Sequence, residues 1–258
     1  MEELILLVNT SIVSDECVVR DQYYSGCPHR ERTAVLLRLS QSWFRFGSLE
    51  ILAKSEELAV LKQVTDFVIK EYFSDINLTD ENKYIRLFSE IAHRTLDLVA
   101  KWQGLGFTHG LLNTDNMSLL GVTLDYGPFG FVDSYDSGYV ANSSDGEGRY
   151  ALGKQSEIAV WNISQLANAL EPLMTTSQQV HTSHILKTLD SYCKNKILET
   201  FLMKIGLKKE RWGDEELVEK LLDMMQHTGA DFTATFRQLA ELEPCEMVSE
   251  WKLKEKWS

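Results

Sequence analysis

Hydrophobic residues follow a strand-like pattern near the start of the chain. Glu31–Leu39 (ERTAVLLRL) is rich in aliphatic and β-branched residues and follows a turn-like segment at residues 25–31, which predicts a β-strand. A second strand is predicted over Trp43–Ile51 (WFRFGSLEI). The first fifty residues are therefore expected to be rich in β-structure.

From about residue 55 the spacing of hydrophobic residues becomes helical. They recur every three or four positions over residues 58–72 and 84–102, and the second of these helices is expected to end near Gly104 and Gly106. A glycine-rich, turn-rich stretch follows as far as residue 148. Further helices are predicted over residues 156–170, 183–203, 215–226 and 232–242. Strands first and helices afterwards, with loops between them, predict an α+β fold.

Composition places the chain among soluble globular proteins. Hydrophobic residues make up 44% and charged residues 25% of the 258 positions, which excludes a disordered or fibrous chain. The 38 acidic and 26 basic residues give a net charge of −12, so no overall attraction to nucleic acid or to an anionic membrane is expected. No apolar run approaches the ~20 residues that cross a bilayer.

The cysteines and the N-terminal residues add little chemistry. Cys17, Cys27, Cys193 and Cys245 form no C-x-x-C pair, so neither a zinc site nor a disulfide framework is expected. The first residues, MEELILLVNTS, are acidic where a signal peptide is basic, and they are unlike a mitochondrial transit peptide. We therefore expect a cytosolic protein or a chain whose natural start lies upstream.

Residues 107–133 (FTHGLLNTDNMSLLGVTLDYGPFGFVD) contain the densest group of candidate functional side chains. Asn116 and Asp125 supply the hard oxygen ligands that a divalent cation prefers, and the spacer MSLLGVTL is long enough for a short β-hairpin between them. Protein kinases place a metal-binding Asn and the Asp of an Asp-Phe-Gly motif in this order. The pattern therefore predicts a metal–nucleotide site.

The spacing also identifies a departure from active kinases. If His109 occupies the His of H-R-D-x-x-x-x-N, Asn116 falls on the Asn and Asp125 opens an Asp-Tyr-Gly motif. The position of the catalytic base is then Leu111, which cannot accept a proton. Asp115 is an extra carboxylate beside the metal ligand, and His109 is expected to be structural. This pattern is that of a pseudokinase.

Five segments carry distinctive motifs: TAVLLRLSQSWFRFGSLEI (33–51), HGLLNTDNMSLLGVTLDYGPFGFVD (109–133), NSSDGEGRYALGKQ (142–155), WNISQLANAL (161–170) and HTGADFTATF (227–236). Together they closely resemble the selenoprotein O family, also called the YdiU family. The resemblance extends from about Thr10 to about Leu242.

The resemblance implies a protein-kinase-like fold and a specific reaction. Members of the family transfer AMP from ATP, with Mg²⁺, to Ser, Thr or Tyr hydroxyls of proteins. Residues 1–54 would be the remnant of the β-rich nucleotide-binding lobe. Residues 55–258 would form the helical lobe, with the catalytic and metal loop at 107–133. Eukaryotic members are mitochondrial and bacterial members are cytoplasmic.

The family's functional residues can be carried over one by one. Its catalytic carboxylate corresponds to Asp115, its metal ligands correspond to Asn116 and Asp125, and Asp125 also faces ATP. Two arginines that hold ATP phosphate correspond to Arg38 and Arg45. Because these arginines are seven positions apart, one continuous strand would place them on opposite faces. We therefore predict a turn at residues 40–42 that directs both toward one ligand.

Some features of the family are expected to be missing. No glycine-rich phosphate loop precedes Arg38, the ion-pairing Lys and Glu of the family should lie upstream, and its Sec- or Cys-bearing C-terminal extension has no counterpart. We expect a truncated member that binds ATP weakly and transfers AMP slowly or not at all. Two alternatives stay open: an inactive pseudokinase that acts as a binding or regulatory module, and a phosphotransferase in which Asp115 replaces the missing base. The oligomeric state is not indicated.

Overall fold

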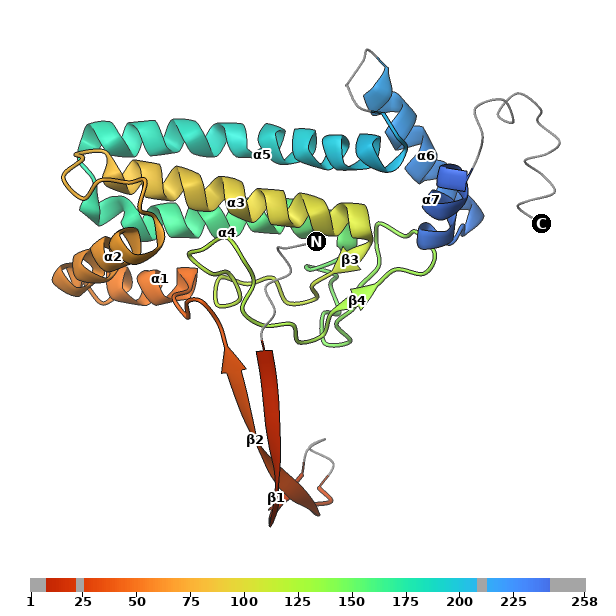
Figure 1. Ribbon diagram of the computed structural model, residues 1–258, viewed down its shortest axis with the longest axis horizontal. Coiled ribbons are helices and arrows are strands. Elements are labelled where there is room, and N and C mark those ends of the chain that lie inside the picture. The colour runs from red at the N-terminus through yellow and green to blue at the C-terminus, as the bar shows by residue number, and fades with distance from the viewer. Residues whose placement is uncertain (1–7, 22–25, 208–212, 242–258) are drawn as a thin grey trace. The chain divides into compact units, whose positions relative to one another are not determined.

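The computed structural model describes residues 8–21, 26–207 and 213–241. Its elements belong to two compact units, and the chain passes from the first to the second between Trp43 and Phe44 (Figure 1). The first unit holds two strands, β1 (Val8–Arg20) and β2 (His29–Leu39). Within the described ranges the second unit holds mostly helix and one two-stranded sheet. The expected α+β class is confirmed. The predicted lobe boundary after residue 54 stays a prediction.

The elements of the second unit follow in this order: α1 (Phe46–Lys54), α2 (Leu58–Tyr72), α3 (Lys83–Leu105), β3 (Phe107–Thr108), β4 (Gly130–Phe131), η1 (Leu152–Lys154), α4 (Gln155–Leu170), η2 (Glu171–Leu173), α5 (Thr176–Lys204), α6 (Asp214–Thr228) and α7 (Phe232–Glu241). All six predicted helices are present. The helix α5 begins earlier than predicted because Thr175 caps it, its hydroxyl accepting from the N–H of Gln178.

The first unit is an antiparallel hairpin. The pairing of β1 with β2 runs from Val8 opposite Leu39 to Arg20 opposite His29, with one irregularity between Val13 and Cys17. The predicted strand over Glu31–Leu39 lies inside β2 and is confirmed.

The second predicted strand, over Trp43–Ile51, is wrong. The chain leaves the sheet after Leu39 and forms α1 from Phe46. Phe46 and Leu49 lie one helical turn apart and both are fully buried, so helical rather than alternating spacing matches the core here. Burial against the rest of the unit decides the conformation of this short apolar segment.

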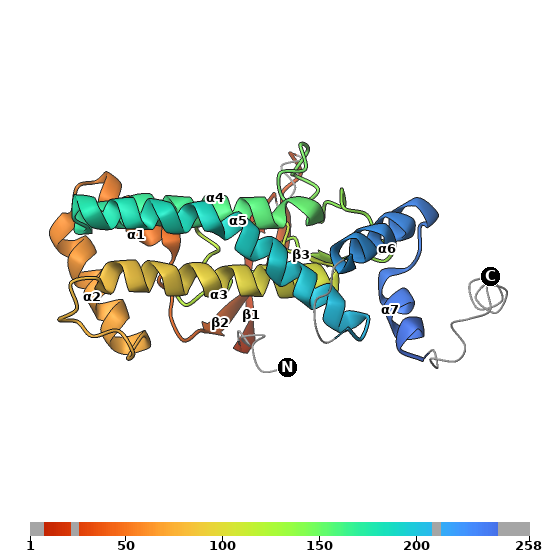
Figure 2. The same ribbon diagram turned by 90° about the horizontal axis from the view of Figure 1, so that it is seen from above.

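Long helices form the centre of the second unit. Figures 1 and 2 show α3, α4 and α5 lying along one another, and α1 packs on α4. Their contact faces form one hydrophobic core that includes Phe88 and Leu166, both fully buried. The helix α3 ends where predicted, because Gly106 adopts the left-handed conformation (φ 65°) that favours glycine.

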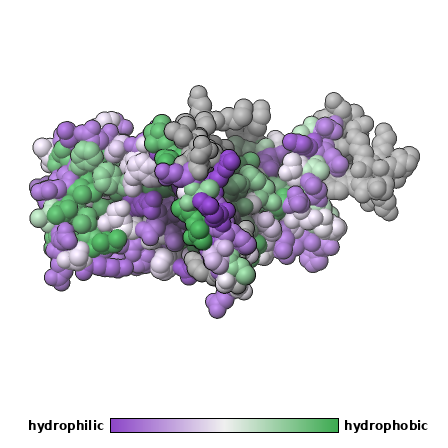
Figure 3. Space-filling model, turned by 90° about the horizontal axis from the view of Figure 1, so that it is seen from below, coloured by the Kyte–Doolittle hydropathy of each residue, from purple (hydrophilic) through white to green (hydrophobic). Residues whose placement is uncertain are grey.

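A smaller core joins α6 and α7 to the end of α5. It includes Phe201, Phe232 and Phe236, and the Lys204 ammonium lies 4.2 Å from the centre of the Phe236 ring. On the face of the molecule in Figure 3, hydrophilic and hydrophobic residues are interspersed over the helical unit. None of the described helices combines the length and the apolar character needed to cross a membrane.

A charged cluster fastens α2 to the start of α3. The Asp66 carboxylate accepts from Lys62 Nζ at 2.6 Å, Lys83 Nζ at 2.7 Å and the Tyr84 hydroxyl at 2.9 Å. Partial burial raises the pKa of Asp66, but the hydrogen bonds from these three groups together outweigh it and hold the pKa below its ordinary value of 3.8. The carboxylate is therefore a stabilising anion at neutral pH.

This cluster gives a prediction about stability and pH. Asp66→Asn should lower the free energy of unfolding at pH 7 by about 2 kcal/mol, because it removes hydrogen bonds to a charged group. Since the folded-state pKa is depressed, the contribution is present above pH 3.8 and is lost as the pH falls through the folded-state pKa. Denaturant unfolding at pH 7 and pH 3 measures this. Asp75→Asn, at an exposed carboxylate, is the matched control; equal effects of both substitutions would contradict the prediction.

Candidate functional site

The segment between β3 and β4 contains most of the predicted site residues. The two strands pair antiparallel, with Phe107 opposite Phe131 and Thr108 opposite Gly130. Between them the chain forms a loop over residues 109–116, the segment that was aligned with the catalytic loop of kinases. A short hairpin then follows before Asp125.

The hairpin predicted between Asn116 and Asp125 is confirmed. Met117 and Thr123 form an antiparallel bridge, and the turn between them contains Gly121 at a positive φ of 76°. The N–H of Leu124 donates to the carbonyl of Asn116 at 3.1 Å. The hairpin thus brings Leu124 back to Asn116, and Asp125 is the next residue along the chain.

Asn116 is buried and its amide has a defined orientation. Its side chain is 7% exposed, and Nδ2 donates to the carbonyl of Leu111 at 2.7 Å. Because the nitrogen is held by the backbone, Oδ1 is the atom that the side chain can present to a ligand. No described residue donates a hydrogen bond to Oδ1 in the structure. This orientation suits a metal-ligating amide oxygen.

Asp125 is half-buried and Asp115 is exposed. Within the described part of the chain, no cluster of three or more His, Cys, Asp or Glu side chains could hold a metal ion alone. One amide oxygen and one carboxylate nevertheless suit Mg²⁺, which is usually held by one or two protein ligands together with water and substrate phosphates. Asn116 and Asp125 therefore fit Mg²⁺ in the presence of a nucleotide.

His109 is a buried structural residue. It is 1% exposed, its Nδ1 accepts from the N–H of Leu111 at 3.3 Å, and its Nε2 lies 2.7 Å from Oγ1 of Thr123. Burial lowers the pKa of His109 to about 4, and the opposing effect of Asp125 is smaller. Because the neutral ring accepts a hydrogen bond at Nδ1, its proton is on Nε2, and Nε2 donates to the Thr123 hydroxyl. The Thr123 hydroxyl in turn donates to the carbonyl of Asn116 at 2.9 Å.

Two buried amides of α4 hold the loop from behind. Gln155 and Asn162 are both fully buried and lie two helical turns apart. Gln155 Oε1 accepts from the N–H of His109 at 2.8 Å, and its Nε2 donates to the carbonyl of Phe107 at 2.9 Å. Asn162 Nδ2 donates to the carbonyl of Leu112 at 2.9 Å.

Gln155 and Asn162 were not predicted from the sequence as residues of the site. A signal was present, because two amides spaced seven residues apart lie on the otherwise apolar inner face of α4. Their hydrogen-bond acceptors and donors are backbone groups of another segment, so no side-chain motif reveals the pairing.

The two predicted phosphate-binding arginines lie in different units. Arg45 is the residue before α1, and its backbone pairs with Ser118, two positions after Asn116. Arg38 lies on β2, in the hairpin unit. The strand does end between them, at Leu39, and the Ser40 hydroxyl donates to the carbonyl of Ser42 at 2.8 Å. That both arginines face one ligand stays a prediction.

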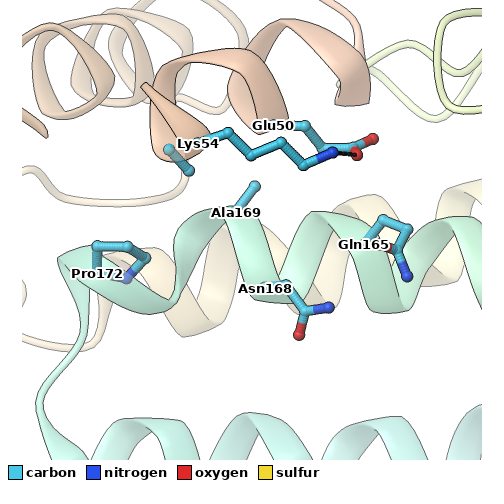
Figure 4. A pocket seen from close by; sticks show the side chains of 7 residues that line it. Glu50, Lys54, Gln165, Asn168, Ala169 and Pro172 are labelled. Carbon is cyan, nitrogen blue, oxygen red and sulfur yellow. Dashed lines mark hydrogen bonds and ion pairs between the residues drawn. The ribbon is translucent and has the colours of Figure 1, made fainter. Parts of the chain in front are cut away.

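A cleft of about 210 Å³ lies between α1 and the end of α4 (Figure 4). An ion pair between Glu50 and Lys54, at 3.3 Å, lies along one side of it. No predicted site residue is among those that line it: Glu50, Ala53, Lys54, Gln165, Asn168, Ala169 and Pro172. The cleft is thus separate from the loop site.

Comparison with known proteins assigns the family. The family model described as protein adenylyltransferase SelO matches residues 10–255. This chain belongs to the SelO family. The match includes every residue singled out above as part of the site.

Curated relatives agree with this membership. The chain is 41% identical over 250 residues to protein adenylyltransferase SelO-1, mitochondrial, of Danio rerio, covering 90% of this chain and 35% of that protein. It is 39% identical over 241 residues to protein nucleotidyltransferase YdiU of Flavobacterium johnsoniae, covering 92% and 45%. It is 39% identical over 254 residues to protein adenylyltransferase SelO, mitochondrial, of Homo sapiens, covering 92% and 38%. This SelO-family chain thus spans less than half the length of these relatives.

The α4 contacts lead to a stability prediction. Gln155→Ala should lower the free energy of unfolding by about 3 kcal/mol, because it leaves the N–H of His109 and the carbonyl of Phe107 buried without these partners. The matched control is Gln165→Ala on the same helix, at a half-buried side chain, with an expected change within about 0.5 kcal/mol. Chemical denaturation compares the two variants, and equal losses would contradict the role of Gln155.

Proposed function

We propose that this chain carries the transfer centre of a protein adenylyltransferase, which moves AMP from ATP to Ser, Thr or Tyr hydroxyls of proteins. The observation that carries the proposal is the loop of residues 109–116. It combines an oriented, buried Asn116 with an adjacent exposed carboxylate, Asp115, while Leu111 stands at the kinase base position. The SelO family supports the same reaction class.

We also propose a kinase-like architecture for the complete protein. A loop, a metal-ligand Asn, a hairpin and an Asp-Tyr-Gly motif follow one another in the order used by kinases. The long helix α3 precedes this series, and further helices follow it. The order of elements supports this architecture, in which the β-rich lobe would complete the nucleotide site.

Each site residue has a distinct task in the proposed reaction. Asn116 and Asp125 hold Mg²⁺, which when bound neutralises charge that develops on the leaving pyrophosphate. Arg38 and Arg45 bind phosphate oxygens through their guanidinium groups. Asp115 orients the acceptor hydroxyl and takes its proton. The hydroxyl oxygen bonds to the α-phosphorus as the bond from that phosphorus to the pyrophosphate oxygen breaks.

Leu111 has a structural role that separates this site from that of a phosphotransferase. Its carbonyl accepts from Asn116 Nδ2 and its N–H donates to His109, so its backbone orders the loop while its side chain cannot serve as a base. Proton acceptance therefore falls to Asp115. The proposal extends to the compartment: mitochondria if the chain is eukaryotic, as in the names of the Danio rerio and Homo sapiens relatives, and the cytoplasm if it is bacterial.

Parallel labelling with α-labelled and γ-labelled ATP, with Mg²⁺ and protein acceptors, tests the proposal. We expect label only from the α-position, and its loss when EDTA removes the metal. Asp115→Ala should reduce the rate by at least about 10²-fold with little change in Mg²⁺-dependent ATP affinity. Asp125→Ala should reduce both. Asp75→Ala is the matched control at an exposed carboxylate outside the site.

Other outcomes identify the alternatives. Label from the γ-position alone would establish a phosphotransferase. If neither the α-label nor the γ-label is transferred but ATP still binds, the chain would be a binding or regulatory module.

A further inference from the structure

We propose that Gly47, in the first turn of α1, sets the position of the Asp115 carboxylate and is a positioning residue for the transfer step. This inference rests on the proposed function of Asp115. It arises from the way the start of α1 lies against the loop, an arrangement that involves residues far apart in the sequence.

The loop covers the N-terminal end of α1. The N–H of Phe46 donates to the carbonyl of Met117 at 2.9 Å, and the N–H of Gly47 donates to the carbonyl of Thr114 at 3.2 Å. Amides in the first turn of a helix have no partner inside the helix, so the loop supplies their acceptors. The two acceptors lie on either side of Asp115 and Asn116, which fixes this part of the loop against the helix.

Gly47 leaves the space that the Asp115 side chain occupies. A Cβ built on Gly47 would overlap Oδ1 of Asp115 and would lie 3.2 Å from its Cγ, and every other neighbour would be at ordinary contact distance. Gly47 is buried and lies inside a regular helix, without a positive φ. Glycine lowers helix propensity relative to alanine. The close approach of Asp115 therefore explains the glycine better than backbone conformation does.

The contact favours one orientation of the carboxylate. A negative charge is stabilised beside the N-terminus of a helix, and the Asp115 side chain lies there. Because Asp115 is exposed, a larger residue at position 47 would turn its carboxylate out toward solvent without disturbing the core. Arg45 lies two residues before Gly47, so one turn of helix locates both the proposed proton acceptor and a proposed phosphate ligand.

The test is a double-mutant cycle of Gly47→Ala and Asp115→Ala, with Gly146→Ala as the matched control. Gly146 is exposed, and a Cβ there would meet no atom within 4 Å. In the wild-type background we expect Gly47→Ala to lower kcat for α-label transfer by about 10²-fold, with KM for ATP within about 2-fold, because a small misplacement of a catalytic group is costly. In the Asp115→Ala background it should cause no further loss of kcat.

Thermal unfolding provides a readout that does not depend on activity. Once Asp115→Ala has removed the overlapping atoms, Gly47→Ala should raise Tm by up to about 3 °C through helix propensity. With Asp115 present, this gain should be absent. If Gly47→Ala alone fails to fold, the double variant should fold.

The outcomes separate this inference from the proposed function. Unchanged kcat in Gly47→Ala, an equal effect on Tm in both backgrounds, or a double variant that also fails to fold would overturn the role of Gly47. If the wild-type chain transfers no AMP, the proposed function fails and the catalytic part of this inference fails with it. The Tm cycle then still decides whether Gly47 and Asp115 are in contact.

Discussion

The structure of the site depends on how the buried backbone of residues 107–112 satisfies its hydrogen bonds. Backbone N–H and C=O groups removed from water need partners, and β3 is too short for its ladder with β4 to supply them all. Gln155 supplies two of the missing partners with one amide, which acts toward Phe107 and His109 as a neighbouring strand would. Asn162 continues the support at Leu112.

The functional geometry follows from this anchorage. Because His109 is fixed and neutral, its ring can form hydrogen bonds to Leu111 and Thr123. The carbonyl of Leu111 then accepts from the side chain of Asn116, and the hydroxyl of Thr123 donates to the backbone carbonyl of Asn116. The start of α1 then bounds the loop through Met117 and Thr114. The proposed metal and proton-transfer groups are thus held by contacts of the loop with α1, which ends at Lys54, and with α4, which begins only at Gln155.

Local patterns in the sequence predicted much of this molecule. The helical periodicity of residues 58–72 and 84–102 is strong because each helix buries one continuous face, and the spacer between Asn116 and Asp125 had the length of a hairpin. Helix α1 was not predicted because it is short and contains a glycine. The acceptors for its first amides lie on the distant loop. The hydrogen-bonding role of Gln155 could not be predicted from the sequence either, because its partners are backbone groups up to 48 residues away. The roles of the site residues and the convergence of Arg38 with Arg45 stay predictions.

Native-state hydrogen exchange at the His109 amide tests the central claim most directly. If Gln155 anchors this segment to the core, this amide should exchange only through global unfolding, with the same free energy as amides of the buried centre of α3, such as Leu96. In Gln155→Ala its protection should fall selectively, while that of Leu96 follows global stability. Exchange of the His109 amide in the wild-type protein at the rate of an exposed loop would contradict the account.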